Sequence, residues 1–357
     1  MFFLYLRRKL IFMNNEQILT YFLNLSDSQQ HSLLSDLNRS KIESDYSSLL
    51  KLRGDALDDK RAECPHCKSF NFIKYGKDKG CRKYKCKDCK GGFTEYTGTW
   101  INGIHKKHLI PSFMKSLESS LSLVKTSKEI GVSEPTVFNW RHKFLSSQEP
   151  KEEEEEPFKG ITESDETFYQ HSQKGKKCTH RDPRKRGERF SRGITNEEAA
   201  VLTTMDRAGN AQYQFTNMGR ISLAELENAI GKRITERTIL CSDGHNSYKA
   251  LAKKQEIEHH ILNASKKERV KGEFHIQHVN SLHSRMKNFF NHQLRGVSTK
   301  YLQKYLNWQK IKDQFKSSTQ WIKTMLAKSL LRADALSIFK NIEKNYLKIY
   351  KPSQLFS

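Results

Sequence analysis

The sequence predicts a multidomain protein with N-terminal helices, a small metal-bound β module and a helix-turn-helix, followed by an α/β domain with C-terminal helices. Three observations lead to this fold class. The chain has 357 residues, which is too long for one ordinary hydrophobic core. Two cysteine pairs stand near its start, as Cys64-Pro-His-Cys67 and Cys86-Lys-Asp-Cys89. Beyond residue 158, strand-like runs alternate with helical runs, which is typical of layered α/β or α+β domains.

The charge of the chain indicates a polyanionic partner. Lysine and arginine number 63 against 40 aspartates and glutamates, which gives a formal net charge of +23. This excess is far larger than solubility requires, and nucleic acid is its natural partner. A membrane surface also attracts cations, but no apolar run approaches the length of a membrane-spanning helix.

The first residues do not have the order of a secretory signal. Residues Met1 to Leu6 are apolar, but Arg7, Arg8 and Lys9 follow them directly. We therefore expect a cytoplasmic, nucleoid-associated protein without membrane attachment. Met1 and Met13 are both possible translation starts, because a helix-like pattern begins only after Met13.

Residues 1–59 are expected to form an N-terminal helical segment. Ser26 and Gln29 have the spacing of a capping box, and apolar residues at helical spacing stand on both sides of it. We interpret this segment as a small packing or pairing element.

Residues 60–100 predict a zinc ribbon. Four thiolates in two Cys-x-x-Cys motifs suit one tetrahedral, structural Zn²⁺. Hairpin-like runs rich in aromatic residues surround these motifs. The expected ligands are Cys64, Cys67, Cys86 and Cys89. His66 lies inside the first motif as an alternative ligand, although four cysteines already complete the shell, so we expect its ring to be exposed. The remaining cysteines are expected to be ordinary thiols in a reducing compartment: Cys81, Cys178 and Cys241.

Residues 101–148 predict a helix-turn-helix DNA-binding region. Thr126 and Glu129 have the spacing of a capping box, Gly131 follows as a turn residue, and Ser133 can cap a second helix. A helix, a glycine turn and a second helix form the arrangement that places the second helix in a major groove. The candidate DNA contacts on that second helix are Thr136, Asn139 and Arg141. An ordinary helical hairpin is the alternative interpretation.

A run of glutamates in residues 149–157 marks a domain boundary, because such a run is normally a solvated linker. Residues 158–310 then predict the α/β domain, with strands at 199–204 and 211–216 joined by a hairpin turn, a helix at 222–230 and a strand at 238–242. Residues 311–357 predict a C-terminal helical extension.

Two aspartates stand at predicted strand ends in this domain. Asp165 is expected to end the strand that begins at Phe158, and Asp243 directly follows the apolar run 238–242. Acids brought together from separated strands can hold the two metal ions, Mg²⁺ or Mn²⁺, that phosphodiester cleavage needs. The alternative is that each aspartate is only a turn or cap residue.

A third group of side chains lies at helical spacing. Asn280, His283 and Lys287 share one face of a predicted helix that can look toward the two acids. The amide of Asn280 can complete the shell of a hard cation, and Lys287 can grip a phosphate. Alternatively, Asn280 is a helix cap and Lys287 is one of many solvated lysines.

The order of these motifs resembles bacterial insertion-sequence transposases of the DDE superfamily, and among them the group with an N-terminal zinc ribbon and a third catalytic position that is often Asn. The motifs that carry the resemblance are the zinc ribbon, the helix-turn-helix, Ser164-Asp165-Glu166-Thr167, the run from Cys241 to Tyr248 and the run from His278 to Lys287. Shorter matches occur at 93–99 and 296–302, so the resemblance covers roughly residues 60 to 310.

The resemblance implies an RNase H-like catalytic fold. It places Asp165 on the first strand, Asp243 after the fourth, and Asn280 on the helix after the fifth. Asp165, Asp243 and Asn280 would be the metal-binding catalytic residues, and Lys287 would contact the transposon-end phosphates, with Arg285 as a further DNA contact. A neutral amide binds Mg²⁺ less strongly than the superfamily's more usual Glu. Neither Glu273 nor His278, which could assist, lies on the matching position.

A basic run at residues 170–192 follows the first acid. Such a run is normally a solvated loop, but its connection to an active-site strand makes contact with the DNA backbone an equal alternative. Its densest part, and the first choice for that contact, is Arg184, Lys185 and Arg186.

The sequence therefore predicts a transposase that binds the terminal inverted repeats of an insertion sequence and cuts and joins double-stranded DNA by metal-dependent phosphoryl transfer. A homo-oligomer is implied, because two transposon ends must be handled together. The alternative is a catalytically inactive DNA-binding regulator derived from a transposase, and a structure-selective nuclease is a third hypothesis.

Overall fold

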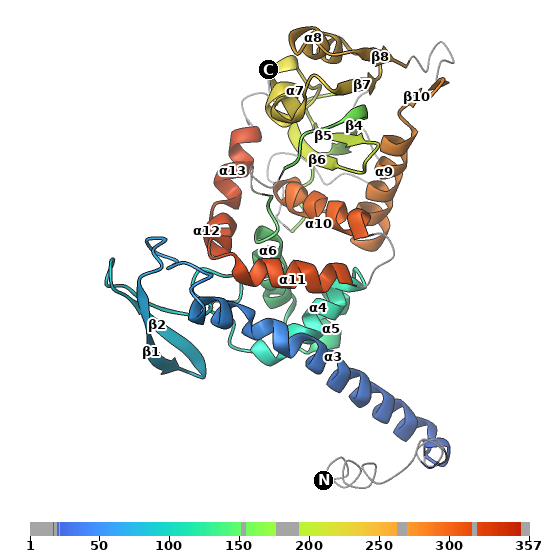
Figure 1. Cartoon of the computed structure of the whole chain (residues 1–357). Helices are drawn as coiled ribbons and strands as arrows, with labels where there is room; N and C mark the ends of the chain where they lie inside the picture. Colours follow the sequence, from blue (N-terminus) through green and yellow to red (C-terminus); the bar gives the residue numbers. More distant parts are fainter. Residues whose placement is uncertain are drawn as a thin grey trace.

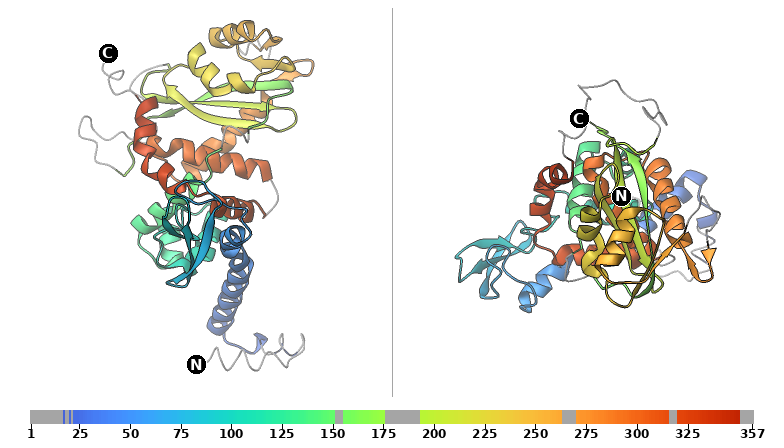
Figure 2. Two further views of the ribbon diagram at one scale, coloured as in Figure 1. Left: turned by 60° about the vertical axis from the view of Figure 1, so that its left-hand side comes forward. Right: turned by 90° about the horizontal axis from the view of Figure 1, so that it is seen from above.

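The computed structural model of the chain describes residues 22–150, 155–175, 193–262, 270–315 and 320–350, together with Gln17 and Thr20. Figure 1 shows a sheet with its helices at one end of the molecule, a helical region in the middle, and a small β ribbon and a long helix at the other end. Figure 2 gives two further views of the same arrangement.

Helix α3 (Asp27–Asp58) is the long helix near the N-terminus, and its first turns project away from the rest of the molecule (Figure 1). Ser26 is its N-cap, and the backbone N–H of Ser26 donates to the Gln29 side chain at 3.1 Å. The capping box expected at these two residues is therefore present. The helix continues to Asp58, close to the end of the helical segment expected at residues 1–59.

The ribbon that follows is a three-stranded antiparallel sheet in the order β1–β2–β3. Its strands are β1 (Phe72–Asp78), β2 (Cys81–Cys86) and β3 (Gly92–Thr94). A small core forms where Phe72, Tyr84 and Phe93 meet, with ring centroids 5.4 to 5.7 Å apart. Three aromatic rings bury too little apolar surface to hold such a module alone, so a further staple is needed.

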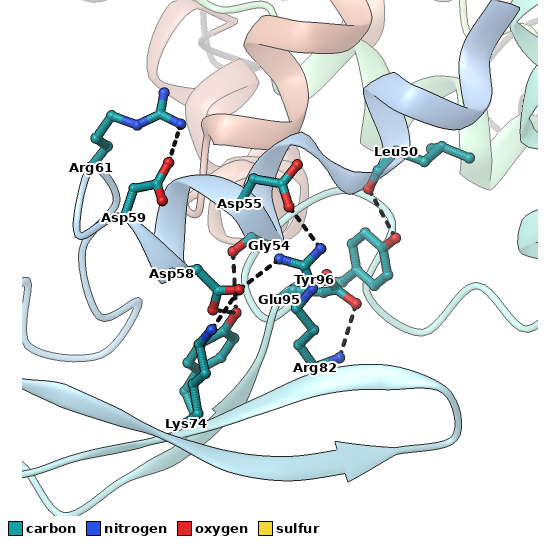
Figure 3. Close-up of polar contacts among 11 residues, drawn as sticks. Leu50, Gly54, Asp55, Asp58, Asp59, Arg61, Lys74, Arg82, Glu95 and Tyr96 are labelled. Atoms are coloured by element: carbon teal, nitrogen blue, oxygen red, sulfur yellow. Dashed lines mark hydrogen bonds and ion pairs between the residues drawn. The ribbon is translucent and has the colours of Figure 1, made fainter.

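Polar contacts fix the ribbon to the last turns of α3 (Figure 3). The Arg82 guanidinium donates to Asp55 Oδ1 at 2.7 Å and to Asp58 Oδ2 at 2.9 Å, and the Arg82 backbone N–H donates to Glu95 Oε1 at 3.0 Å. A side chain at Gly54 would collide with the carboxylate of Glu95 and the guanidinium of Arg82. Glycine in the last turns of this helix therefore permits the close approach of the ribbon.

Three helices follow the ribbon and form the predicted DNA-binding region: α4 (Ile110–Glu118), α5 (Leu123–Ile130) and α6 (Glu134–Ser146). Gly131 ends α5 in the left-handed conformation, with φ 68°, as a glycine turn requires. The predicted start of α5 was wrong. Its N-cap is Ser122, whose hydroxyl accepts from Lys125 N, and Thr126 is buried within the helix.

The α/β part is built on a five-stranded mixed sheet in the order β6–β5–β4–β7–β8. Strand β4 is antiparallel to β5 and parallel to β7, and β7 is parallel to β8. The strands are β4 (Gly160–Gln170), β5 (Glu198–Asp206), β6 (Ala211–Met218), β7 (Thr238–Ser242) and β8 (His259–Ile261). A two-stranded ribbon consists of β9 (Val270–Lys271) and β10 (Phe274–His275).

Helices cover both faces of this sheet (Figures 1 and 2). Residues of β5 alternate between the two sides, since Ala200 and Leu202 belong to one apolar cluster and Ala199 and Val201 to the other. The first cluster includes α7 (Leu223–Ile230) and α8 (Asn246–Lys254), and the second includes α9 (Gln277–Asn288) and α10 (Leu302–Phe315). Short turns of other helix types are η1 (Lys107–Leu109), η3 (Gly231–Arg233), η5 (Phe289–Gln293) and η6 (Thr299–Tyr301).

The C-terminal helices pack back onto the N-terminal half. They are α11 (Gln320–Leu331), α12 (Ala335–Lys340) and α13 (Ile342–Ile349). Helix α11 lies against α3 and α4, and α12 against α6. The Trp100 indole N–H donates to Ser329 Oγ at 2.9 Å across this contact. One apolar cluster therefore runs from α4–α6 through α10 and α11 to the sheet.

No helix in the described part of the chain combines the length and the apolar character needed to cross a lipid bilayer.

Candidate active site and metal centres

Asp165 lies in the middle of β4 and pairs with Thr203 of β5. This corrects the expectation that Asp165 ends its strand, because β4 continues through Gln170. Asp243 directly follows β7, as predicted. The parallel register pairs Glu163 of β4 with Cys241 of β7, and two further residues along each chain bring Asp165 and Asp243 side by side.

Three carboxyl groups meet at this point. Asp165, Glu166 and Asp243 each offer an oxygen, and these atoms all lie within 4.8 Å of one another. The sequence interpretation assigned no role to Glu166. Neighbouring residues of a strand point to opposite faces, so Asp165 and Glu166 leave β4 on different sides. Asp243 lies past the end of β7, where it is close to both carboxyls. The signal that could have identified Glu166 was its place within the Ser164-Asp165-Glu166-Thr167 motif.

The electrostatics of this cluster disfavour three unscreened negative charges. Burial, and next the charge of Asp243, raises the pKa of the Asp165 carboxyl to about 7. Burial, and next the charges of Asp165 and Asp243, raises the pKa of Glu166 to about 8. The folded chain therefore holds carboxylates at a free-energy cost that a bound cation would relieve.

The donor set fits a divalent metal such as Mg²⁺ or Mn²⁺. Hard cations of this kind prefer carboxylate and amide oxygens, and they bind through one or two carboxylates with the rest of the shell from water or substrate phosphate. The described residues supply three carboxylates and no cysteine to this group. We therefore regard Asp165, Glu166 and Asp243 as able to hold a catalytic divalent cation.

Helix α9 places the third predicted group over β4 and β5. His283 is buried, and its Nδ1 lies 3.8 Å from Asp165 Oδ2. Burial, with the positive charge of Lys287, lowers the pKa of His283 to about 4, so the ring is neutral at pH 7. Asn280 and Lys287 are exposed on the same helix. The positive charge of Lys287 partly opposes the rise in the pKa of Asp165.

A hollow continues from Lys287 along the end of β4. Its lining includes Gln170 and Ser172 from the chain of β4, and His292 and Arg295 from the segment after α9. A second, more apolar hollow shares Arg295 and reaches α5 and α6. The two hollows lie side by side at Arg295, one reaching Lys287 of α9 and the other reaching α5 and α6.

The four ribbon cysteines meet as predicted. Their Sγ atoms all lie within 4.8 Å of one another, with 3.9 Å between Cys64 and Cys89 and 3.6 Å between Cys67 and Cys86. Tetrahedral Zn²⁺ with Zn–S bonds of about 2.3 Å requires sulfur atoms about 3.8 Å apart. This geometry is consistent with zinc binding. His66 is exposed, as expected.

The three side chains of α6 predicted to contact DNA differ in their exposure to solvent. On α6, Asn139 is exposed and Thr136 is half-buried, so both side chains can be reached. Arg141 is buried, donates to Leu121 O at 2.8 Å and lies over the Trp308 ring. Its prediction as a DNA contact is corrected, since the helix turns it toward the core.

Two further predictions concern basic side chains near the active site. Arg285 pairs with Asp313 at 2.7 Å, although its side chain stays 43% exposed and can still reach a phosphate. The predicted contacts Arg184, Lys185 and Arg186 lie outside the described residues, as does Cys178.

Comparisons with known proteins agree with this site. Residues 157–310 match the family described as the ISXO2-like transposase domain. The chain is 24% identical over 274 residues to a Halobacterium salinarum protein named "Uncharacterized protein in transposable element ISH50", which covers 75% of this chain and 91% of that relative. A structural match to the crystal structure of a pre-cleavage Mos1 transpososome has 11% identity and a TM-score of 0.24, over 67% of this chain and 79% of the other. A score this low supports no inference about fold.

The family match contains Asp165, Glu166, Asp243 and α9 in full, and it ends within α10. The resemblance inferred from the sequence motifs is therefore confirmed. The comparisons therefore support an insertion-sequence transposase, with residues 157–310 matching the ISXO2-like transposase domain.

Proposed function

We propose that this transposase binds the terminal inverted repeats of its insertion sequence and catalyses both strand cleavage and strand transfer by metal-dependent phosphoryl transfer. The observation that carries the proposal is the meeting of Asp165 and Asp243 in one carboxylate cluster, with α9 beside it. These residues are far apart in the sequence, and a purely structural role would not require their charges to be gathered.

We further propose that the catalytic domain is RNase H-like. The positions of three residues in the sheet support this assignment. Asp165 lies on β4, the first strand of the five-stranded sheet, and Asp243 follows β7, the fourth strand. Asn280 lies on α9, the first helix after β8, the fifth strand.

Each side chain has a distinct proposed task. Asp165 and Asp243 hold the divalent cations, with Glu166 as an additional carboxylate and the amide oxygen of Asn280 in the third position. Bound divalent cations would lower the pKa of the attacking hydroxyl and neutralise charge at the leaving oxygen. Lys287 binds a phosphate of the transposon end, and neutral His283 packs beside Asp165 without adding charge. In the proposed cleavage step water attacks the phosphorus and the P–O3′ bond breaks, which releases a DNA 3′-hydroxyl. In the proposed transfer step this 3′-hydroxyl attacks a target phosphorus, and the target strand's 3′-oxygen leaves.

Recognition of the DNA ends is assigned to the N-terminal half. We propose that the zinc ribbon and α6 contact the inverted repeat, with Thr136 and Asn139 facing the groove. Arg184, Lys185, Arg186 and Arg285 are proposed to grip the backbone near the catalytic site. Two ends have to be held together, so we propose that the active form on DNA is a homo-oligomer.

Cleavage of labelled end DNA with Mg²⁺ or Mn²⁺ tests the proposal. Wild-type protein should cut at the transposon end, while Asp165→Ala and Asp243→Ala should each remove cleavage and keep end binding. Glu258→Gln is the matched control, since Glu258 is an exposed carboxylate of the same domain whose side chain contacts His260. Tight binding without cutting by wild type would instead identify a DNA-binding regulator. Cutting without joining, on any junction, would identify a nuclease.

A further inference from the structure

Glu163 is a fully buried carboxylate to which the sequence interpretation gave no role. It precedes Asp165 by two residues on β4, so both side chains leave the same face of the strand. Its side chain is 1% exposed and reaches the start of α9. A buried carboxylate is stable only when its oxygens are well bonded, so its partners indicate what it holds.

The two closest backbone partners of Glu163 are N–H groups in the first turn of α9. Glu163 Oε2 accepts from His278 N at 2.9 Å and from Val279 N at 3.2 Å. Helix N-termini leave such donors without intrahelical partners, and a negative charge is favourable there. No side-chain cap is present at Ile276, the N-cap residue of α9, so Glu163 performs that task from another element.

This bond connects two parts of the active site by a very short path. Val279 directly precedes Asn280, and Glu163 is two residues from Asp165. Asp165 is therefore linked to Asn280 through two residues of β4, the Glu163 carboxylate and its hydrogen bond to the Val279 backbone N–H. A shift of about 1 Å at a reacting centre can cost about 100-fold in rate.

A second layer fixes the carboxylate of Glu163 itself. Arg207, in the turn between β5 and β6, places Nη1 2.7 Å from Glu163 Oε1 and donates through Nη2 to Glu273 O at 3.0 Å. His278 Nδ1 lies 2.6 Å from the same Glu163 oxygen. The Arg207 guanidinium therefore lies beside both Glu163 and His278, and it supplies the positive charge that the buried carboxylate needs.

A positive charge from the same chain segment contacts the loop that follows α9 and η5. Lys174, which follows β4, donates through Nζ to Arg295 O at 2.6 Å and to Gly296 O at 2.9 Å, just after η5. Cations are favourable at the carboxyl end of a helical segment. The β4 segment thus places a carboxylate before α9 and an ammonium after it.

We propose that Glu163 is a positioning residue that sets the amide of Asn280 against Asp165 for metal binding. This inference rests on the proposed function of the site, and it assigns the task to a group that contacts neither substrate nor metal. Loss of such supporting partners typically weakens metal affinity or activity about 10- to 100-fold.

The test measures Mn²⁺ affinity by electron paramagnetic resonance on the full, zinc-loaded chain, so that it does not depend on cleavage. An Asp165→Ala, Asp243→Ala double variant gives the blank. Glu163→Ala should weaken Mn²⁺ binding about 10- to 100-fold, and Glu163→Gln, which keeps an acceptor oxygen, should weaken it less. The matched control is Glu225→Ala, because Glu225 Oε2 accepts from Ser222 N at 2.8 Å at the start of α7, on the other face of the sheet.

A double-mutant cycle identifies the route of the effect. If Glu163 acts through Asn280, adding Glu163→Ala to Asn280→Ala should cause no further loss of affinity. Full additivity, or wild-type affinity in Glu163→Ala, would overturn the inference. Thermal unfolding of each variant confirms that the chain is folded at the assay temperature. A wild type that matches the blank would show instead that the proposed metal site itself is wrong.

Discussion

Asp165 and Glu166 make the free energy of unfolding depend on pH. Their pKa values in the folded chain, about 7 and about 8, lie above the value of about 4 expected for an unfolded chain. Between pH 4 and pH 8 the folded state therefore binds more protons than the unfolded state. Stability from this source is present at low pH and is lost as the pH rises through the folded values.

We expect urea unfolding in Mg²⁺-free buffer to show a decrease in stability from pH 5.5 to pH 8, and the double variant Asp165→Asn, Glu166→Gln to flatten that decrease. Adding Mg²⁺ should stabilise the wild type more at pH 8 than at pH 5.5, because the cation competes with protons for the same oxygens. An equal effect of Mg²⁺ on wild type and variant would contradict the assignment of these carboxylates to a metal site.

Individual site residues could be predicted from the sequence where their spacing along the chain identifies them. The two Cys-x-x-Cys motifs and Asp243 after β7 follow from local patterns, and the structure brings each of them to a common centre. Arg141 and Glu163 could not be assigned in this way. Whether a charged side chain of α6 or β4 faces solvent or the interior depends on which distant element covers it.

The ribbon is the element with the smallest core, so its stability should depend on its metal. Metal binding and folding are coupled in modules of this kind. We expect one zinc per chain, and we expect Cys67→Ser to lose it together with high-affinity binding of end DNA. Cys81→Ser is the control, since Cys81 is also a ribbon cysteine but lies outside the cluster.

Zinc release measured with a colorimetric chelator checks this prediction, and circular dichroism reports the rest of the fold. The attachment of the ribbon to α3 through Arg82 is polar and does not involve the thiolates. The helices should therefore keep their melting temperature in Cys67→Ser. A variant that retains zinc would count against the four-cysteine assignment.

Element boundaries were predictable where a cap was visible. The box of Ser26 with Gln29 marks a true helix start, the helix expected at 222–230 is α7, and the strand expected at 238–242 is β7. The start of α5 was misplaced because Thr126, which has the right spacing for a cap, is buried and accepts a hydrogen bond from Arg141. Tertiary contacts decide between two candidate caps, and the sequence does not display them.

Trp308 of α10 packs between the α/β part of the molecule and the N-terminal helix α6. It is fully buried, its ring lies 5.1 Å from that of Phe289, and Arg141 of α6 lies over it. Trp308→Ala should lower the free energy of unfolding by about 3–5 kcal/mol. Leu347→Ala, at a side chain 46% exposed on α13, should change it little.

Fluorescence and far-ultraviolet unfolding curves check this, with end binding and cleavage measured over the same temperatures. Binding and cleavage should fail together in Trp308→Ala, because one core serves both. Loss of cleavage at a temperature where binding persists would indicate two independent units. The shared core depends on contacts such as Trp100 with Ser329, which are separated by most of the chain and leave no local pattern.

The C-terminal helices pack onto α4–α6, so the place of an inactivating mutation in the gene decides whether the product still folds. A stop codon upstream of Leu302 removes the apolar partners of the helices proposed to read DNA, so the shortened product is not expected to persist as a competitor at the transposon ends. A missense change at Asp165 leaves those partners in place. Self-limiting copies of this element should therefore arise by point mutation in the carboxylates and not by erosion of the 3′ end of the gene.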